Sequence, residues 1–305
     1  MTDAIENEDR SGFIGASEVA EALGLSPYSG RSPVRLAMEK LGQLERATID
    51  PNLAKWGKAL QPVILKAVED RIGMRVRDTD DPRGHKSLSW LRCRTDGITH
   101  SGIIVEAKNY SEARAYKYPT ENEPEELPLY DLVQVAAEMA CWDAEVAFLA
   151  VLFGGRDFRM YRIERDPVFE QEILSRLGQF WSYVQRNVVP PASNSVDTAL
   201  LYPRHTEGMM RVATPAVESE VSRLAALKAQ AKQIEAEMER LEGSIKFNMG
   251  AAGQLVAPDG RTIATWKASA DTSSFDSKRF RADHPEMADR YTVIRPGGRR
   301  FIVKS

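Results

Sequence analysis

A long, nearly continuous apolar run at residues 145–153 restricts the fold of this chain more than any other feature. The run reads Glu145-Val-Ala-Phe-Leu-Ala-Val-Leu-Phe153, and Gly154-Gly155 follows it. A strand with one solvated face alternates apolar and polar residues, so a run without alternation predicts a strand buried on both faces. Residues 158–163 do alternate, which predicts a partner strand after a turn at the two glycines.

Apolar residues at helical spacing predict helices on both sides of this strand pair. The segments concerned are residues 15–42 (divided before Pro33), 56–73, 129–142 and 168–189. Within the first segment, the helix is expected to begin at Ser17, because serine often caps helix N-termini. Residues 110–128 are polar and acidic and are expected to form a loop. Buried strands mixed with helices predict an α/β core.

At 305 residues the chain is long for one compact domain. We expect the α/β domain to occupy residues 1–191, and residues 192–214, with their Pro, Ser, Asn and Thr, to form a linker. Residues 249–305 are expected to form a small basic α+β tail, two hairpins around a helix. From Asp259 onward this tail holds ten Lys and Arg against six Asp and Glu.

Residues 215–248, between the linker and the tail, predict an amphipathic helix like those of coiled coils. Its apolar positions step by three and four residues: Leu224, Leu227, Ala231, Ile234, Met238, Leu241 and Ile245. Two uses of this seam stay open at this point. It either joins copies of the chain or packs on the chain's own domain.

Composition excludes several classes of protein. No segment approaches the roughly 20 apolar residues of a membrane span, and the acidic N-terminus has no apolar signal region. Cys93 and Cys141 are too few for a disulfide framework or a zinc site. No glycine-rich phosphate loop for ATP is present. We therefore expect a cytoplasmic protein with no membrane partner and no ATP, although its net charge of -3 does not mark a nucleic-acid binder.

A chemically informative motif lies in a predicted hairpin over residues 88–107. Asp96-Gly97 marks a turn, and the following short apolar strand ends in Glu106-Ala107-Lys108. Side chains alternate along a strand, so Glu106 and Lys108 point to one face and Ala107 to the other. Two carboxylates and an ammonium at one strand end suit metal-assisted phosphodiester hydrolysis, as in the PD-(D/E)xK pattern. The alternative is a solvated strand end with an ion pair.

Five segments in fixed order carry a family resemblance. They are residues 10–28, residues 56–62, the Asp96 and Glu106 to Lys108 pair, residues 130–139, and residues 149–166. Together they resemble the YqaJ-type viral recombinase nucleases, relatives of phage lambda exonuclease. The resemblance covers about residues 10–191. It implies a restriction-endonuclease-like core, with a central mixed sheet flanked by helices.

The resemblance also implies roles for residues of the motif. Asp96 and Glu106 would be carboxylate ligands of Mg²⁺, with the backbone carbonyl of Ala107 as a further ligand and Mn²⁺ as a substitute ion. Lys108 would orient or deprotonate water and balance charge in the transition state. Gln134, on the following helix, would help to hold the lysine and the water. Without the resemblance, Gln134 is an ordinary polar residue of a helix face.

Three further positions correspond to the family's pattern or depart from it. Arg10 and Ser17 match positions that grip a 5′-terminal phosphate, and both an arginine and a helix N-terminus bind phosphate well. Their alternative interpretation is a surface arginine and a helix cap. Gln61 stands where the family commonly has a glutamate that helps to hold a second metal. An amide oxygen binds Mg²⁺ more weakly, so either neighbouring acids compensate or activity is reduced.

The activity implied is that of a Mg²⁺-dependent exonuclease that degrades duplex DNA from its ends, 5′ to 3′, for phage-type recombination. The expected partners are double-stranded DNA ends, a single-strand annealing protein, and further copies of the chain in a ring-shaped homo-oligomer. The expected setting is the cytoplasm of a bacterial host, with a phage or prophage gene. Two alternatives remain: a DNA endonuclease with the same core, and a catalytically weakened DNA-binding or assembly subunit.

Overall fold

The computed structural model of the chain describes residues 9–48, 50–79, 81–121, 123, 126–294 and 297–304. It contains two compact units, the first ending at Leu201 and the second beginning at Tyr202. The candidate functional residues lie in the first.

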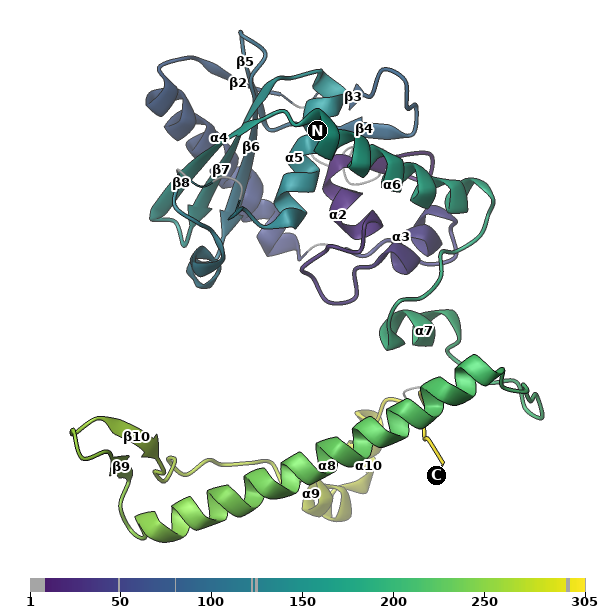
Figure 1. Cartoon of the computed structure of the whole chain (residues 1–305), viewed down its shortest axis with the longest axis vertical. Coiled ribbons are helices and arrows are strands. Elements are labelled where there is room, and N and C mark those ends of the chain that lie inside the picture. The colour runs from purple at the N-terminus through teal and green to yellow at the C-terminus, as the bar shows by residue number, and fades with distance from the viewer. Residues whose placement is uncertain are drawn as a thin grey trace. The chain divides into compact units, whose positions relative to one another are not determined.

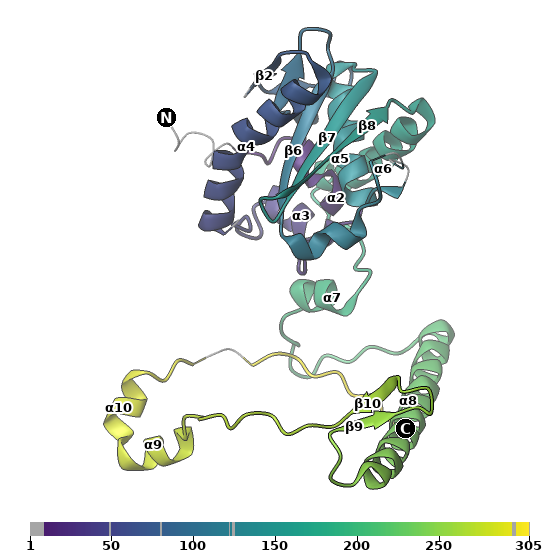
Figure 2. The ribbon, with the colours of Figure 1, turned by 90° about the vertical axis from the view of Figure 1, so that its left-hand side faces the viewer.

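A mixed β-sheet forms the centre of the first unit (Figure 1 and Figure 2). Its strand order is β2 (Val76–Asp78), β5 (Gly97–Thr99), β6 (Ile104–Tyr110), β7 (Val146–Phe153) and β8 (Asp157–Glu164). Strands β6 and β7 run parallel, and the other neighbouring pairs run antiparallel. Helix α5 (Leu129–Trp142) connects the parallel pair. The expected central mixed sheet flanked by helices, the restriction-endonuclease-like architecture, is confirmed.

The apolar run of β7 is buried on both faces, as predicted. Leu149 and Val151 belong to a core that contains Val135 of α5. The alternate residues, Phe148 and Ala150, belong to a second core with residues of helix α4 (Pro51–Ile72). The turn into β8 uses the two glycines of residues 154–155, whose φ angles of 57° and 75° favour glycine.

Helix α4 is longer than the sequence predicted. It begins at Pro51 rather than near residue 56, because Asp50 caps it by accepting a 2.8 Å hydrogen bond from the Asn52 N–H. It passes through Pro62 and ends at Gly73, which has a φ of 67°. The helix covers one face of the sheet along β6 and β7.

A third core lies on the side of α5 away from the sheet. It joins α5 to helix α2 (Val19–Ala22), helix α3 (Pro33–Lys40) and helix α6 (Pro167–Gln185). The predicted division before Pro33 is confirmed, with Ser32 as the N-cap of α3. Helix α6 ends at Gln185, four residues before the predicted end. Helix α5 is thus packed on both sides, which fixes the polar residues that it directs at β6.

A small sheet near the N-terminus changes the predicted hairpin of residues 88–107. Strand β4 (Leu91–Cys93) pairs with β1 (Ile14–Gly15) and β3 (Arg83–Gly84), and not with β5. The chain then crosses to the large sheet, where β5 and β6 form the hairpin expected around residues 101–102. Asp96 lies at this crossing between the two sheets.

Two segments predicted to be irregular contain helices. Residues 110–128 include the 3₁₀ helix η2 (Glu112–Lys117), and the predicted linker includes α7 (Ser195–Leu201). Asp197 of α7 is buried and accepts a 2.5 Å hydrogen bond from Oγ of Ser32. This contact explains why the first unit extends to Leu201 rather than to residue 191.

The second unit consists of a long helix followed by a hairpin and two short helices (Figure 1). These are α8 (Pro215–Met249), β9 (Gln254–Val256), β10 (Thr262–Thr265), α9 (Ser277–Asp283) and α10 (Pro285–Arg290). The first predicted hairpin is confirmed. Pro296, in the turn of the second, lies outside the described residues, and the described residues 291–294 and 297–304 beside it form no strand.

Helices long and apolar enough to cross a membrane are absent from the described part of the chain.

Candidate active site

Asp96, Glu106 and Lys108 come together where β5 begins. Strand β5 begins at Gly97, which pairs with Val105 of β6. The residues of β6 after Val105 therefore have no β5 partner and lie beside Asp96. The Ala107 N–H donates a 2.8 Å hydrogen bond to Oδ2 of Asp96. Nζ of Lys108 lies 2.6 Å from Oε1 of Glu106, as expected for two side chains on one face of a strand. The structure therefore joins the three predicted residues at one edge.

The carbonyl of Ala107 also points toward this edge. The N–H and C=O of one strand residue face the same side, and the Ala107 N–H faces Asp96. The Ala107 side chain packs with the core under α4, on the opposite face from Glu106. The Asp96 carboxylate thus lies beside the backbone of Ala107, whose carbonyl faces the same edge.

Gln134 bridges Glu106 and Lys108. Its Oε1 accepts a 2.9 Å hydrogen bond from Nζ of Lys108, and its Nε2 donates a 2.6 Å hydrogen bond to Oε1 of Glu106. Nε2 also donates a 2.9 Å hydrogen bond to Oε1 of Glu138. A single amide therefore holds both reactive side chains.

Glu138 is a member of the site that the sequence reasoning missed. It is fully buried, and among the described residues its Oε2 has no hydrogen-bond partner. The available signal was its position one helical turn after Gln134, on the same face of α5. Burial raises the pKa of Glu138 well above its usual value, and the nearby Glu106 raises it further.

Asp96 and Lys108 also have shifted pKa values. Burial raises the pKa of Asp96 well above its usual value, the Glu106 carboxylate raises it further, and the Ala107 N–H opposes the shift. For Lys108, burial lowers the pKa, but Glu106 and other negative neighbours outweigh it, so the net pKa is raised. Lys108 is therefore an ammonium at neutral pH. The crowded acids favour a proton or another cation between them.

The donor atoms fit a hard divalent cation. Carboxylate oxygens and a backbone carbonyl are the ligands that Mg²⁺ accepts, and Mg²⁺ usually retains several waters. Within the described ranges, no three His, Cys, Asp or Glu residues lie close enough to hold a metal by themselves. A bound Mg²⁺ would therefore rest on Asp96, Glu106 and the Ala107 carbonyl, with water completing its shell.

Gln61 is directed at another acid. Its Nε2 donates a 3.2 Å hydrogen bond to Oδ1 of Asp78 on β2. Asp78 pairs with Gly97, the residue after Asp96. The Gln61 amide is thus used to hold a carboxylate on the neighbouring strand.

Arg10 belongs to a cationic cluster around Glu18. Nε of Arg10 lies 3.5 Å from Oε1 of Glu18, and Nζ of Lys40 lies 2.7 Å from its Oε2. Lys40 is buried and also donates hydrogen bonds of 2.7 and 2.6 Å to the carbonyls of Arg10 and Phe13. Burial lowers the pKa of Lys40, and Glu18 opposes that shift. Lys40 therefore anchors the segment that carries Arg10.

Two more arginines complete this cluster, and the sequence did not identify them. Nη2 of Arg46 lies 4.0 Å from Glu18, and the guanidinium of Arg92 lies 4.6 Å from the ring centroid of Phe13. Arg92 is on β4, opposite Gly15. Arg10, Lys40, Arg46 and Arg92 thus gather around Glu18 and Phe13, and cations predominate in the cluster.

Ser17 lies close to this cluster but does not cap a helix. The N-cap of the 3₁₀ helix η1 (Ala16–Glu18) is Gly15, and Ser17 is an exposed residue of its single turn. The Arg10 guanidinium packs on Gly15 so closely that an added Cβ there would lie 1.6 Å from its Nη2. The backbone therefore brings Arg10 within two residues of Ser17, while the predicted cap is wrong.

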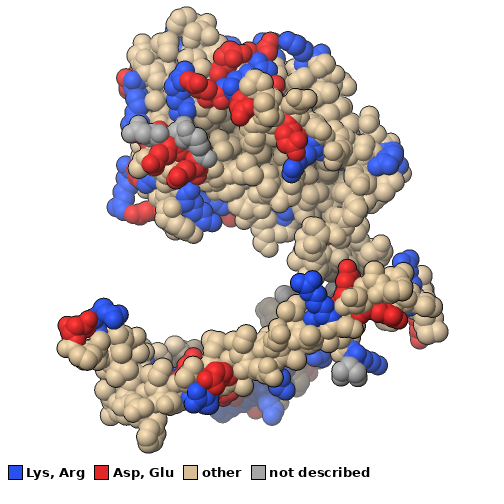
Figure 3. Space-filling view, in the orientation of Figure 1, with Lys and Arg blue, Asp and Glu red and all other residues tan. Residues whose placement is uncertain are grey.

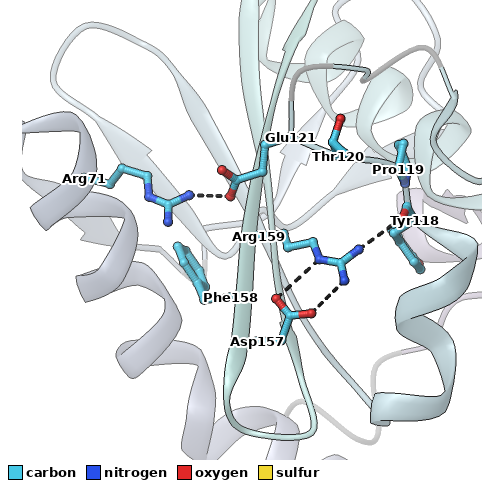
Figure 4. A pocket seen from close by; sticks show the side chains of 8 residues that line it. All are labelled: Arg71, Tyr118, Pro119, Thr120, Glu121, Asp157, Phe158 and Arg159. Carbon is cyan, nitrogen blue, oxygen red and sulfur yellow. Dashed lines mark hydrogen bonds and ion pairs between the residues drawn. The ribbon is translucent and has the colours of Figure 1, made fainter.

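A hollow of about 410 Å³ elsewhere in the first unit is not the candidate site (Figure 4). Its arginines already bind acids: Arg71 pairs with Glu121, and Arg159 pairs with Asp157 at 2.7 Å. Arg159 also donates 3.1 Å hydrogen bonds to two backbone carbonyls. This hollow is therefore stabilised by its own ion pairs, and its lining contains none of the motif residues.

The sheet and the residues at its edge are arranged as in the PD-(D/E)xK pattern. Residues 7–145 match the family model of the YqaJ-like viral recombinase domain. Uncharacterized protein YqaJ of Bacillus subtilis (strain 168) is 27% identical over 291 residues, which are 93% of this chain and 88% of that protein.

Solved structures with a similar arrangement include two exonucleases. An alkaline exonuclease from Laribacter hongkongensis is 18% identical with a TM-score of 0.45, over 58% of this chain and 90% of that one. A phage related exonuclease from Haemophilus somnus 129PT is 14% identical with a TM-score of 0.45, over 62% of this chain and 95% of that one.

Proposed function

We propose that this chain is a Mg²⁺-dependent DNA exonuclease that degrades duplex DNA from a 5′-phosphorylated end. The observation that carries this proposal is the hydrogen-bonded convergence of Asp96, Glu106 and Lys108 at one sheet edge. The match to the YqaJ-like viral recombinase domain supports it independently. The site suits hydrolysis of phosphodiesters, and the matched domain is a recombinase domain. Both point to nucleic acid as the substrate class.

Each residue of the site has a separate task in this proposal. Asp96, Glu106 and the Ala107 carbonyl would hold Mg²⁺, which when bound supplies positive charge and lowers the pKa of bound water. Lys108 directs a fixed ammonium at the place where negative charge develops. Gln134 keeps that ammonium and Glu106 in place through two hydrogen bonds. Mn²⁺, with the same ligand preferences, is expected to substitute.

The cationic cluster supports action at a DNA end. Arg92 lies four residues before Asp96, so even a fully extended chain separates their Cα atoms by at most about 14 Å. That length equals a few nucleotides of strand rise, at about 3.4 Å each. A terminal phosphate bound by Arg10 and its neighbours would therefore place a nearby bond at the site. The exposed single strands would serve a single-strand annealing protein.

The test is a comparison of DNA substrates with purified full-length protein and Mg²⁺. Linear duplex with 5′-phosphates should be shortened, and closed circles should be spared. Lys108→Ala should abolish cleavage but retain DNA binding, whereas Lys86→Ala, at an exposed lysine, should cleave normally. Arg10→Ala should lose the preference for a 5′-phosphate over a 5′-hydroxyl.

Two results would overturn the proposal. Nicking of closed circles would show the endonuclease alternative. DNA binding without cleavage of either substrate, with no change in Lys108→Ala, would show a binding or assembly subunit.

A further inference from the structure

Helix α8 presents an apolar stripe that the described residues leave exposed. Leu227, Ile234, Met238, Leu241 and Ile245 are 52, 60, 57, 46 and 43% exposed. Figure 3 shows long uncharged stretches on the visible face of this helix, between a few charged side chains. An apolar stripe of this length on a well-formed helix indicates a surface that binds another helix.

The chain's own C-terminal segment contacts α8 beside this stripe. Nζ of Lys228 lies 5.8 Å from the ring centroid of Phe301, and Leu224 near it is half-buried. The five residues named above remain exposed in spite of this contact. The C-terminal segment therefore does not replace a partner along most of the stripe.

The charges beside the stripe distinguish between orientations of a second copy. Leu224 at heptad position a places Leu227 at d, Lys228 and Glu235 at e, and Arg223 and Glu237 at g. In a parallel pair, each g residue faces the e residue five positions later on the other helix. Arg223 would then face Lys228, and Glu237 would face Glu242, so both pairs repel.

An antiparallel pair removes these repulsions. Position e then faces e, and g faces g, on the other helix. In the register that places Leu227 against Met238, Lys228 faces Glu235 of the second copy, and twofold symmetry repeats this attraction. The same register places Leu224 against Leu241, both apolar.

The same register matches side-chain sizes at the centre. Ala231 lies opposite Ile234 of the second copy, and the symmetric pair repeats this small-against-large contact. Shifting the register by one heptad in either direction brings Lys228 against Lys228, or Glu235 against Glu235. The first shift also places Arg223 against Glu237, and the second places Lys228 against Glu242, so attraction persists in both. Each shift nevertheless adds a like-charge pair that the proposed register lacks.

We propose that α8 forms an antiparallel coiled coil with α8 of a second copy of this chain, with Leu227 packed against Met238. This interface is independent of the nuclease site and of the proposed function.

Cysteine cross-linking of the full-length protein tests both orientation and register. Both native cysteines, Cys93 and Cys141, are buried. A mixture of Leu227→Cys chains with Met238→Cys chains should form a disulfide-linked heterodimer on mild oxidation, and neither variant alone should. Cross-linking of Leu227→Cys alone would show a parallel pair and overturn the proposal. A monomer at all concentrations, without cross-links, would show that the chain covers its own stripe.

Sedimentation equilibrium supplies the energetic test. Ile234→Asp should weaken dimerisation by more than about 100-fold because it buries a charge twice per dimer. Ala236→Asp, on the opposite side of α8, should leave the dimerisation constant unchanged. Lys228→Glu should weaken the dimer roughly tenfold, and adding Glu235→Lys should restore it. A tighter dimer in Lys228→Glu would indicate that the lysine faces Arg223, as in a parallel pair, and would overturn the proposal.

Discussion

Nε2 of Gln134 donates a 2.9 Å hydrogen bond to Oε1 of Glu138, one helical turn further along α5. The same nitrogen faces Glu106, and the amide oxygen faces Lys108. A flipped amide would direct its oxygen at two carboxylates and its hydrogens at an ammonium. Glu138 therefore reinforces the orientation that Glu106 and Lys108 also favour, and it helps Gln134 to hold Lys108 in position.

Replacing Glu138 should change stability and activity in opposite directions. Glu138→Leu removes a buried carboxyl whose Oε2 has no partner among the described residues, so we expect about 1–3 kcal/mol of added stability. Freeing the Gln134 amide should lower the cleavage rate about tenfold, because the lysine is less well positioned. Urea unfolding and single-turnover cleavage measure the two effects.

Glu138→Gln is the matched control. Its side-chain oxygen still accepts the hydrogen bond from Gln134, so cleavage should remain near that of the parent protein. A fully active Glu138→Leu variant would show that Gln134 needs no positioning by Glu138.

Glu21 on α2 should make the fold less stable as the pH rises toward neutrality. Burial raises the pKa of Glu21 to about 7, neighbouring acids add to the shift, and Arg31, 3.4 Å away, opposes it. A carboxyl with a raised folded-state pKa binds its proton more tightly when folded. Its contribution therefore falls between about pH 4.5 and pH 7, by about 3 kcal/mol in total, and is constant above that range.

Glu21→Gln isolates this contribution. Urea midpoints measured from pH 4.5 to pH 8 should fall more steeply for the parent protein than for the variant, since other buried acids titrate in both. Parallel curves for the two proteins would contradict the assignment.

Local pattern was enough to predict the central part of the fold. The bounds of α5, the two-faced burial of β7 and the common face of Glu106 and Lys108 all depend on periodicity within one element. The partner of β4 depends instead on Ile14, far away in the sequence. No local signal specifies such a pairing, so the sequence placed β4 in the wrong hairpin.

The same distinction applies to the site. Asp96, Glu106 and Lys108 were recognisable as a motif because two of them share a strand. Lys40 and Arg92 became relevant only when folding brought them to Phe13 and Glu18. A buried lysine on a helix has the same sequence pattern as an exposed one. The burial of Lys40 therefore could be recognised only from the structure.

The boundary of the first unit leads to a prediction about truncation. A chain that ends at residue 191 lacks Asp197, and Oγ of Ser32 loses its 2.5 Å hydrogen bond. We expect that chain to be about 1–3 kcal/mol less stable than one that ends at Leu201, because a buried donor is left unpaired. Asp197→Ala in the longer chain should reproduce most of the loss. Equal urea midpoints for the two truncated chains would contradict this boundary.

Gly97, the neighbour of Asp96, should tolerate no side chain. A Cβ there would lie 2.8 Å from Cγ1 of Val76 and 2.9 Å from Cδ2 of Leu65, which pack between β2 and α4. Gly97→Ala should therefore cost about 1–3 kcal/mol through overpacking. The substitution should also lower cleavage, because any shift of β5 displaces the Asp96 carboxylate from the Ala107 N–H.

Gly57→Ala provides the matched control for this substitution. Gly57 lies within helix α4, and an added Cβ would meet nothing within 4 Å. The same chemical change should therefore stabilise the protein by up to about 1 kcal/mol, because alanine favours helix over glycine. Urea unfolding of both variants compares the effects directly. Equal stability changes for the two glycines would show that β5 moves freely against α4, and that close packing does not fix Asp96.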